Sequence, residues 1–216
     1  MEKRNRTEKK LDKIRDLVLQ IQEATKLLVK FSNDANSGVR FDAIEAFCKL
    51  NPLESKACFL QALSDPNELV RVSALEGLGG LHEKIPHDKI AKLLSDKSTL
   101  VRGTAAICLA EVGAIETEFL IKKNIEKAED EEKAAYFFSL CKFGKIEYFL
   151  PFINFLFHDF YRIRCAVANL LPELVSESNA SYILNFLMVQ SKREPTKAAK
   201  SSIVNSIRII KKRWKI

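Results

Sequence analysis

One short pattern recurs at a fixed spacing along this chain. An aspartate is followed by a valine after five residues, an arginine after six and an alanine after nine, in copies that begin at Asp34, Asp65 and Asp96, 31 residues apart. Weaker copies begin at Lys127 and His158. A period between about 20 and 50 residues is typical of proteins built from stacked supersecondary units. We therefore expect a row of similar units, each of which buries its apolar face against its neighbours.

The second half of each unit has the pattern of an amphipathic helix. Apolar residues recur five, nine, thirteen and sixteen residues after each start, except that Glu132 replaces the valine of the fourth copy, and these positions share one side of a helix. Asp34, Asp65 and Asp96 are expected to cap these helices, with Pro66 as a first helical residue.

The first half of each unit is expected to be a shorter helix, as in residues 54–63, 87–94 and 148–157. Gly113 and Gly144, also one period apart, suit the C-terminal ends of two of the longer helices. No segment alternates apolar and polar residues between turn signals, so no β-sheet is expected. Each unit is therefore predicted to be a helix hairpin.

These residues resemble the HEAT-repeat family, in particular the HEAT-like repeats of phycobilisome lyase subunits. The family's mark is complete in three copies: Asp34, Val39, Arg40 and Ala43; Asp65, Val70, Arg71 and Ala74; Asp96, Val101, Arg102 and Ala105. The resemblance covers about residues 22–210. It implies an all-α fold, a right-handed α-solenoid (superhelix) of about six helix hairpins whose second helices line the concave side. It implies an architecture and not an activity.

The chain is expected to form a single α-solenoid domain over residues 1–216. Residues 7–21 are predicted to be an N-terminal capping helix, and residues 22–190 to hold five 31-residue repeats and the start of a sixth. Residues 191–216 would supply the last helix and a basic tail. A last unit at residues 194–200 fits the period only with a five-residue insertion.

The repeated acid and cation are expected to be structural. An aspartate at the turn and a cation six residues later are placed to pair between neighbouring units, and the resemblance implies the same use. The expected ladder consists of Asp34, Arg40, Asp65, Arg71, Asp96, Arg102, Lys133 and Arg164. Because Lys127 and His158 replace the aspartate, Lys133 and Arg164 are expected to lack that partner and to be the better placed for contact with a ligand.

The opposite side of the same helices is a candidate binding surface. Positions three, seven, eleven and fourteen residues after each start carry small and apolar residues, with acids toward one end. Exposed apolar patches mark interaction sites. The alternative is that helix rotation or a covering terminus buries these side chains. The expected protein-binding set is Phe41, Glu45, Glu68, Val72, Glu76, Ile107, Phe138, Tyr161 and Asn169.

The sequence offers no catalytic, cofactor or metal motif. His82, His87 and His158 have no ligand spacing with one another or with a cysteine. The five cysteines are expected to be reduced thiols in or near the core: Cys48, Cys58, Cys108, Cys141 and Cys165. No apolar run approaches the roughly 20 residues of a membrane span, and the first residues lack the apolar stretch of a secretory signal. A cytoplasmic protein with no membrane segment is expected.

The net charge of +7 is unevenly distributed. Residues 1–30 hold nine Lys and Arg against five Asp and Glu, and residues 191–216 hold nine against one. Residues 31–190 hold 17 against 22, so the body is mildly acidic. This distribution argues against a nucleic-acid clamp over the whole molecule and leaves only the basic ends for such contacts.

Three functions are compatible with these observations. The leading one is a non-enzymatic scaffold or adaptor that binds another protein in its groove; Glu45, Glu68 and Glu76 favour a basic segment, and an inhibitor or immunity protein would be one variety. The second is nucleic-acid binding or DNA repair, since HEAT-like alkylbase glycosylases exist, although this chain has no tryptophan within its repeats. The third, from the repeat type alone, is a lyase or chaperone subunit. The oligomeric state is left open.

Overall fold

The structure, a computed structural model, describes residues 2–50, 54–81 and 84–215. All regular elements in these ranges are helices, and none of the described residues forms a strand. The chain divides into two compact units, Met1–Ile85 and Pro86–Ile216. One domain over residues 1–216 stays a prediction. No helix in the described ranges is both long enough and apolar enough to cross a bilayer.

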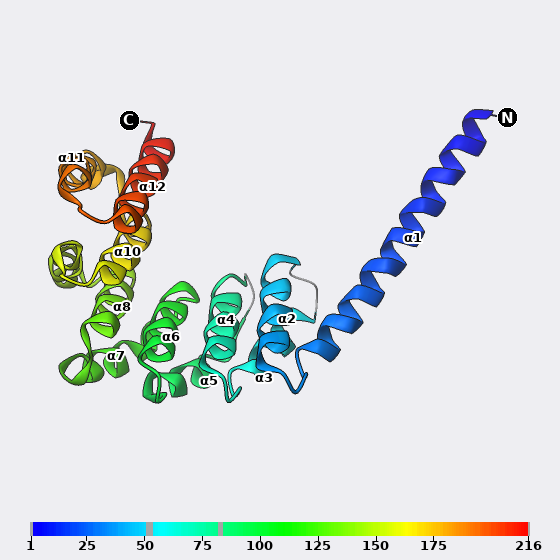
Figure 1. Cartoon of the computed structure of the whole chain (residues 1–216), viewed down its shortest axis with the longest axis horizontal. Helices are drawn as coiled ribbons and strands as arrows, with labels where there is room; N and C mark the ends of the chain where they lie inside the picture. The colour runs from blue at the N-terminus through cyan, green and yellow to red at the C-terminus, as the bar shows by residue number, and fades with distance from the viewer. Residues whose placement is uncertain (1, 51–53, 82–83, 216) are drawn as a thin grey trace. The chain divides into compact units, whose positions relative to one another are not determined.

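The first unit contains α1 (Glu2–Phe31), α2 (Ser37–Leu50), α3 (Ser55–Ala62) and α4 (Glu68–Gly79). Helices α2, α3 and α4 pack against one another, and α1 contacts α2 near its C-terminal end while the rest of it extends away as one long helix (Figure 1). The packing is tight at Gly77, where a Cβ atom would lie 2.5 Å from the Phe59 ring. Only glycine allows α3 and α4 to approach this closely at that point.

The second unit continues the alternation of short and long helices. Its helices are α5 (His87–Ala91), α6 (Thr99–Glu111), α7 (Glu118–Asn124), α8 (Asp130–Lys142), α9 (Phe149–Asn154), α10 (Tyr161–Leu170), α11 (Glu177–Arg193) and α12 (Lys197–Trp214). Short 3-10 segments extend or join several of them. Helix α6 packs along α8, and α12 packs along both α10 and α11. One apolar core runs from α8 to α12 and includes Phe138, Phe152, Val167, Leu187 and Ile203.

The longer helices follow the sequence period. Five of them begin 31 residues apart, at Ser37, Glu68, Thr99, Asp130 and Tyr161. The period therefore extends through the two repeats that begin at Lys127 and His158, where the sequence motif is incomplete. Helix α12 begins at Lys197, which is 36 residues after Tyr161, as the five-residue insertion requires. The expected all-α hairpin architecture is confirmed.

The three repeat aspartates lie two residues before the helix caps, so their expected role as N-caps is wrong. Asp65 Oδ1 accepts the backbone N–H of Asn67 at 2.8 Å, and Asn67 Oδ1 accepts that of Leu69 at 2.9 Å. Pro66 therefore lies in the turn and is not a helical residue. The same short turn follows Asp34 and Asp96. Aspartate favours this turn because its carboxylate can bond the backbone two residues later.

Gly113 and Gly144 end α6 and α8, as predicted. Their φ angles are +73° and +83°, values that glycine adopts without strain. After Gly113, the N–H of Ala114 donates to the carbonyl of Leu109 at 2.9 Å, and the Gly113 N–H donates to that of Ala110 at 3.2 Å. This pair of bonds satisfies two carbonyls that the helix end would otherwise leave open.

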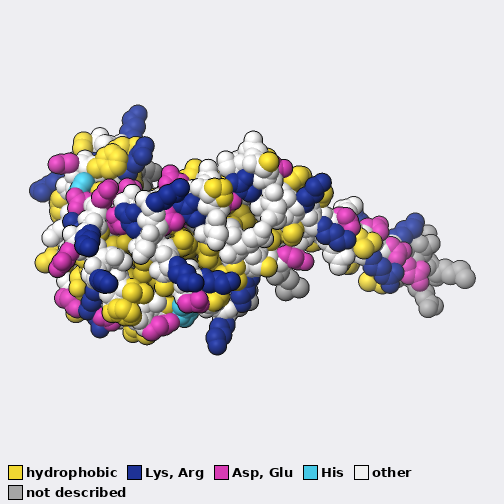
Figure 2. All heavy atoms as spheres, turned by 90° about the horizontal axis from the view of Figure 1, so that it is seen from below, with side chains coloured by type: hydrophobic (Ala, Val, Ile, Leu, Met, Phe, Trp, Pro, Cys, Tyr) yellow, Lys and Arg dark blue, Asp and Glu magenta, His cyan; other side chains and the backbone are white. Residues whose placement is uncertain are grey.

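The N-terminal helix does not cover the first repeat, so the capping role expected of residues 7–21 is wrong. Its apolar side chains are exposed, from 48% at Leu11 to 63% at Ile21. They lie at the surface among charged side chains (Figure 2). No glycine or proline interrupts residues 7–31, so α1 continues in one piece and does not fold back onto α2. Leu50, in the first repeat, stays 66% exposed.

Candidate functional site

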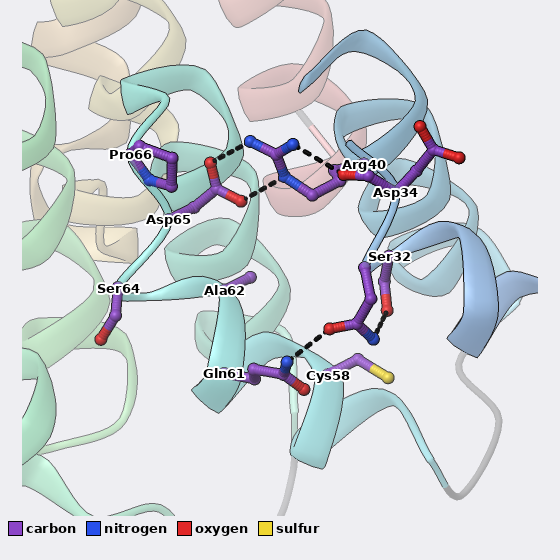
Figure 3. Close-up of a pocket in the computed structure, with 10 residues that line it drawn as sticks. Ser32, Asp34, Arg40, Cys58, Gln61, Ala62, Ser64, Asp65 and Pro66 are labelled. Carbon is purple, nitrogen blue, oxygen red and sulfur yellow. Dashed lines mark hydrogen bonds and ion pairs between the residues drawn. The ribbon is translucent and has the colours of Figure 1, made fainter. Parts of the chain in front are cut away.

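An arginine of α2 joins two successive repeats in the first unit (Figure 3). Arg40 Nε donates to Asp65 Oδ2 at 2.6 Å, and its Nη2 donates to Asp65 Oδ1 at 2.8 Å. The Nη1 atom donates to the carbonyls of Asp34 and Ala35 at 2.8 and 3.0 Å. All three guanidinium nitrogens are therefore engaged, one on its own loop and two on the next repeat. We call such an arginine–carboxylate pair between repeats a rung.

Arg71, one period later, makes the same contact with its own loop. Its Nη1 donates to the carbonyls of Asp65 and Pro66 at 2.7 and 3.2 Å. The residue is buried. These two bonds from one nitrogen hold the turn against the start of α4.

The first rung of the second unit takes its acid from an unexpected position. Arg102 donates from Nε and Nη2 to the two carboxylate oxygens of Glu132 at 2.5 and 2.8 Å, and from Nη1 to the carbonyl of Asp96 at 2.8 Å. Glu132 stands where the motif has valine, and it replaces the carboxylate that Lys127 lacks. Its buried carboxylate also accepts the hydroxyl of Tyr136 at 3.2 Å.

The expectation that Arg164 lacks an acidic partner is wrong. Its Nε and Nη2 donate to Glu194 Oε2 and Oε1 at 2.9 and 2.7 Å, and its Nη1 donates to the carbonyls of His158 and Asp159. The two side chains are 8% and 0% exposed. The five-residue insertion moves the acid of the last unit to Glu194, where Thr196 N–H also donates to it at 3.0 Å.

Lys133 forms no rung within the described residues. It lies 3.5 Å from Asp130 on its own helix, and His158 Nε2 lies 3.2 Å from the same carboxylate. The loop residue at the aspartate position of the next repeat is His158, which brings no carboxylate. This position therefore has a surface cluster in place of a buried pair.

The rung carboxylates titrate below their ordinary range. Hydrogen bonds from Arg164 lower the pKa of Glu194 to about 2 against the effect of burial. Burial acts to raise the pKa of Glu132 and of Asp65, but hydrogen bonds from Arg102 and Arg40 outweigh it, so both values are lowered. The rungs are therefore charged pairs at neutral pH, and they hold the repeats together.

Hollows of the surface lie beside three rungs. They measure about 370 Å³ beside Arg40, about 250 Å³ beside Arg102 and about 400 Å³ beside Arg164. In the first, Gln61 Nε2 donates to Asn33 Oδ1 at 2.5 Å (Figure 3). The charged side chains that line these hollows are the rung arginines and carboxylates, which are already paired with each other. We therefore interpret the hollows as crevices between repeats and not as ligand sites.

The nine residues expected to line one groove are divided between the two units. The first unit holds Phe41, Glu45, Glu68, Val72 and Glu76, and the second holds Ile107, Phe138, Tyr161 and Asn169. The exposed members are Glu68, Glu76, Tyr161 and Asn169, and the half-buried ones are Phe41, Glu45, Val72 and Ile107.

Phe138 is fully buried, so its place in an exposed groove is wrong. Its ring centroid lies 5.9 Å from that of Phe152 in α9, inside the apolar core. Helix α8 is covered by neighbours on most of its circumference, and the helical spacing alone could not show this.

The first unit keeps an acidic and apolar surface on α2 and α4. Phe41 lies one helical turn before Glu45, and Val72 lies one turn before Glu76. Partial burial of the Glu76 carboxyl, and after it the negative charge of Glu45, raises the pKa of Glu76. Neither glutamate forms an ion pair with any other described residue. We call Phe41, Glu45, Glu68, Val72 and Glu76 the acidic face.

The thiols and imidazoles form no metal site in the part of the chain that the structure describes. No group of three His, Cys, Asp or Glu there could hold a metal ion, and His82 lies outside the described residues. His87 Nδ1 lies 2.6 Å from Glu116. Burial raises the pKa of Cys108 and of Cys141 to about 12, so these thiols stay protonated at neutral pH.

Comparisons with known proteins agree with this architecture. A family model described as HEAT repeats matches residues 57–118. The chain also resembles a solved structure, the complex of CpcE and CpcF of phycocyanin lyase from Nostoc sp. PCC7120, with a TM-score of 0.66 at 17% identity over 88% of this chain and 83% of that chain. Among curated proteins, no sequence matches it. The repeated motif, the hairpins that it builds and these two matches together show HEAT repeats at residues 57–118 and, for the chain, the fold of a HEAT-repeat solenoid.

Proposed function

We propose that this protein is a non-catalytic adaptor that binds a basic, partly apolar segment of another protein on the acidic face. One observation carries the proposal: Glu45 and Glu76 hold like charges close together, and neither forms an ion pair with a described cation. Elsewhere in the fold, buried carboxylates such as Glu132 and Glu194 are matched with arginines. A carboxylate pair left unmatched at the surface is suited to a cation that a partner supplies.

The surroundings of this pair suit a peptide. Phe41 and Val72 are half-buried, so each offers apolar surface beside a carboxylate. Apolar contacts at the centre of an interface supply most of its affinity, while complementary charges set orientation and association rate. A partner segment with a lysine or arginine beside an aliphatic or aromatic residue would fit both features.

The fold supports a binding role. The ladder arginines Arg40, Arg102 and Arg164 are fully used between repeats, which leaves them unavailable to a phosphate ligand. The similar solved structure is itself a complex of two proteins, so this architecture can serve in protein assembly. An inhibitor or immunity protein would be one form of such binding.

Affinity capture from the source organism tests the proposal. Wild-type protein is compared with the Phe41→Ala/Glu76→Gln variant and with a matched control, Glu126→Gln/Glu177→Gln, which changes exposed acids of the second unit. We expect one basic protein to be captured by wild type and control and lost with the variant. A captured protein that binds all three equally would show that the acidic face is not the binding surface.

A further inference from the structure

The last helix has an outer surface of one charge. Five cations of α12 are exposed on one side of it: Lys197, Lys200, Arg208, Lys211 and Lys212. At 100° per residue they fall within an arc of about 120°, and at 1.5 Å per residue they span about 22 Å of the helix axis. We call these five residues the basic stripe.

The basic stripe is not compensated within the fold. Residues 195–216 contain no Asp or Glu, and the preceding acid, Glu194, is bound to Arg164. None of the five cations forms an ion pair with a described residue; Arg208 donates only to Asn205 of the same helix, at 2.9 Å. Lys200 stands at the position that carries the rung arginine in earlier repeats, yet it is exposed and forms no rung among the described residues.

We propose that the basic stripe is a binding surface for the phosphate backbone of a nucleic-acid duplex. A straight row of cations fits a polyanion with regularly spaced charges, and a duplex carries one negative charge per about 1.7 Å of its axis. Ser201 and Asn205 are exposed beside the cations and can donate further hydrogen bonds to phosphate oxygens. The contact would be independent of base sequence.

Two other anionic partners fit the stripe less well. A lipid surface would require apolar side chains that enter the bilayer, but the apolar face of α12, with Ala199, Ile203 and Ile210, is buried against the protein. Among the large apolar side chains of α12, the exposed one is Val204, at 51%, and one valine gives little surface for insertion into a bilayer. An acidic protein segment would match a straight row of five cations only with acids at regular helical spacing.

This surface is separate from the acidic face and can be tested separately. A fluorescent duplex of about 20 base pairs is titrated with the full chain between about 50 and 200 mM salt. If about four of the five cations each neutralise one phosphate, the logarithm of the binding constant should fall with the logarithm of the salt concentration with a slope of about −4. The variant Lys200→Gln/Lys211→Gln/Lys212→Gln should lose about three from that slope and at least tenfold in affinity at the lower salt.

The matched control is Lys89→Gln/Lys92→Gln/Lys123→Gln, which removes three exposed lysines from α5, its 3-10 extension and α7. It should bind the duplex like wild type, and Lys200→Arg/Lys211→Arg/Lys212→Arg should retain binding. Equal melting midpoints show that all variants fold. Absence of binding at low salt, equal loss in the control, or tighter binding of polyglutamate or of phosphatidylserine vesicles at the same salt would overturn the proposal.

Discussion

Successive repeats of the second unit are joined in two different ways. Between α10 and α12, Arg164 and Glu194 form a buried bidentate pair, and the two helices pack along much of their length. Between α8 and α10, the helices meet over a shorter stretch, and the equivalent cation, Lys133, lies at the surface near Asp130. His158 occupies the loop position of the missing acid, with its ring 5.9 Å from that of Phe155.

This difference shows what the repeat specifies. The motif sets where the cation stands, but the acid can come from the loop, as in Asp65, or from the helix, as in Glu132. The rung forms wherever a carboxylate reaches the guanidinium from the next repeat. Where neither position offers one, aromatic packing and a surface cluster take its place.

The largest expected effect comes from removal of one partner of the buried rung. Glu194→Ala leaves the Arg164 guanidinium buried without its carboxylate, and loss of one partner of a buried pair costs about 3–5 kcal/mol. The free energy of unfolding in urea measures it. Because an apolar replacement of both partners is often tolerated, Arg164→Met/Glu194→Leu should be more stable than the single variant. A loss below about 0.5 kcal/mol in the single variant would contradict the role of the rung.

Lowering the pH should remove the stabilisation that the Arg164–Glu194 pair provides. The pKa of Glu194 is lowered from 4.5 in the free group to about 2 in the fold, so the unfolded chain binds its proton first as pH falls. The stabilisation is complete above about pH 5 and is lost progressively between about pH 4.5 and 2. Urea unfolding at several pH values should show the difference between wild type and Glu194→Gln narrowing over that window. A difference that stays constant down to pH 2 would contradict the lowered pKa.

A larger side chain at the close contact between α6 and α8 should destabilise the protein. A Cβ atom at Gly103 would lie 3.3 Å from the Cβ of Ala135, so Gly103→Leu should force the helices apart at a cost of about 1–3 kcal/mol. Ala166 of α10 is exposed, and Ala166→Leu serves as the control, with an expected change within about 0.5 kcal/mol. Equal melting midpoints for the two variants would show that α6 and α8 are not in close contact.

The smallest effect is expected at Lys133. Its pairing with Asp130 at 3.5 Å is at the surface, so Lys133→Ala should change the free energy of unfolding by less than about 1 kcal/mol. The change Lys133→Arg/His158→Asp would supply both groups of a rung and should stabilise the fold. If the double variant is less stable than wild type, α8 and α10 are not spaced for a rung.

The sequence predicted the architecture because the period is visible in residues that fix local structure. The starts of α8 and α10 follow the same 31-residue spacing even where Lys127 and His158 break the motif. The predictions that were wrong concern features that depend on how the helices pack against one another. The same apolar stripe in residues 7–21 is compatible with a capping helix or with a helix that leaves the fold, and only packing decides between them.

The site was predicted less well for similar reasons. Phe138 has the spacing of an exposed stripe, but α9 covers it. Glu194 was missed as a rung partner because the insertion displaces it from the period. A signal did exist for Glu132, since an acid in an otherwise apolar column must be paired with a cation if it is buried.

The measurement that tests the proposed function most directly is the effect of Glu45→Gln/Glu76→Gln on both stability and binding. The raised pKa of Glu76 means that its charge is unfavourable in the free protein, so the variant should melt at the same temperature as wild type or slightly higher. Its affinity for the captured basic partner should fall about tenfold or more, with a weaker dependence on salt. Unchanged affinity, with an unchanged dependence on salt, would contradict the acidic face as the binding surface.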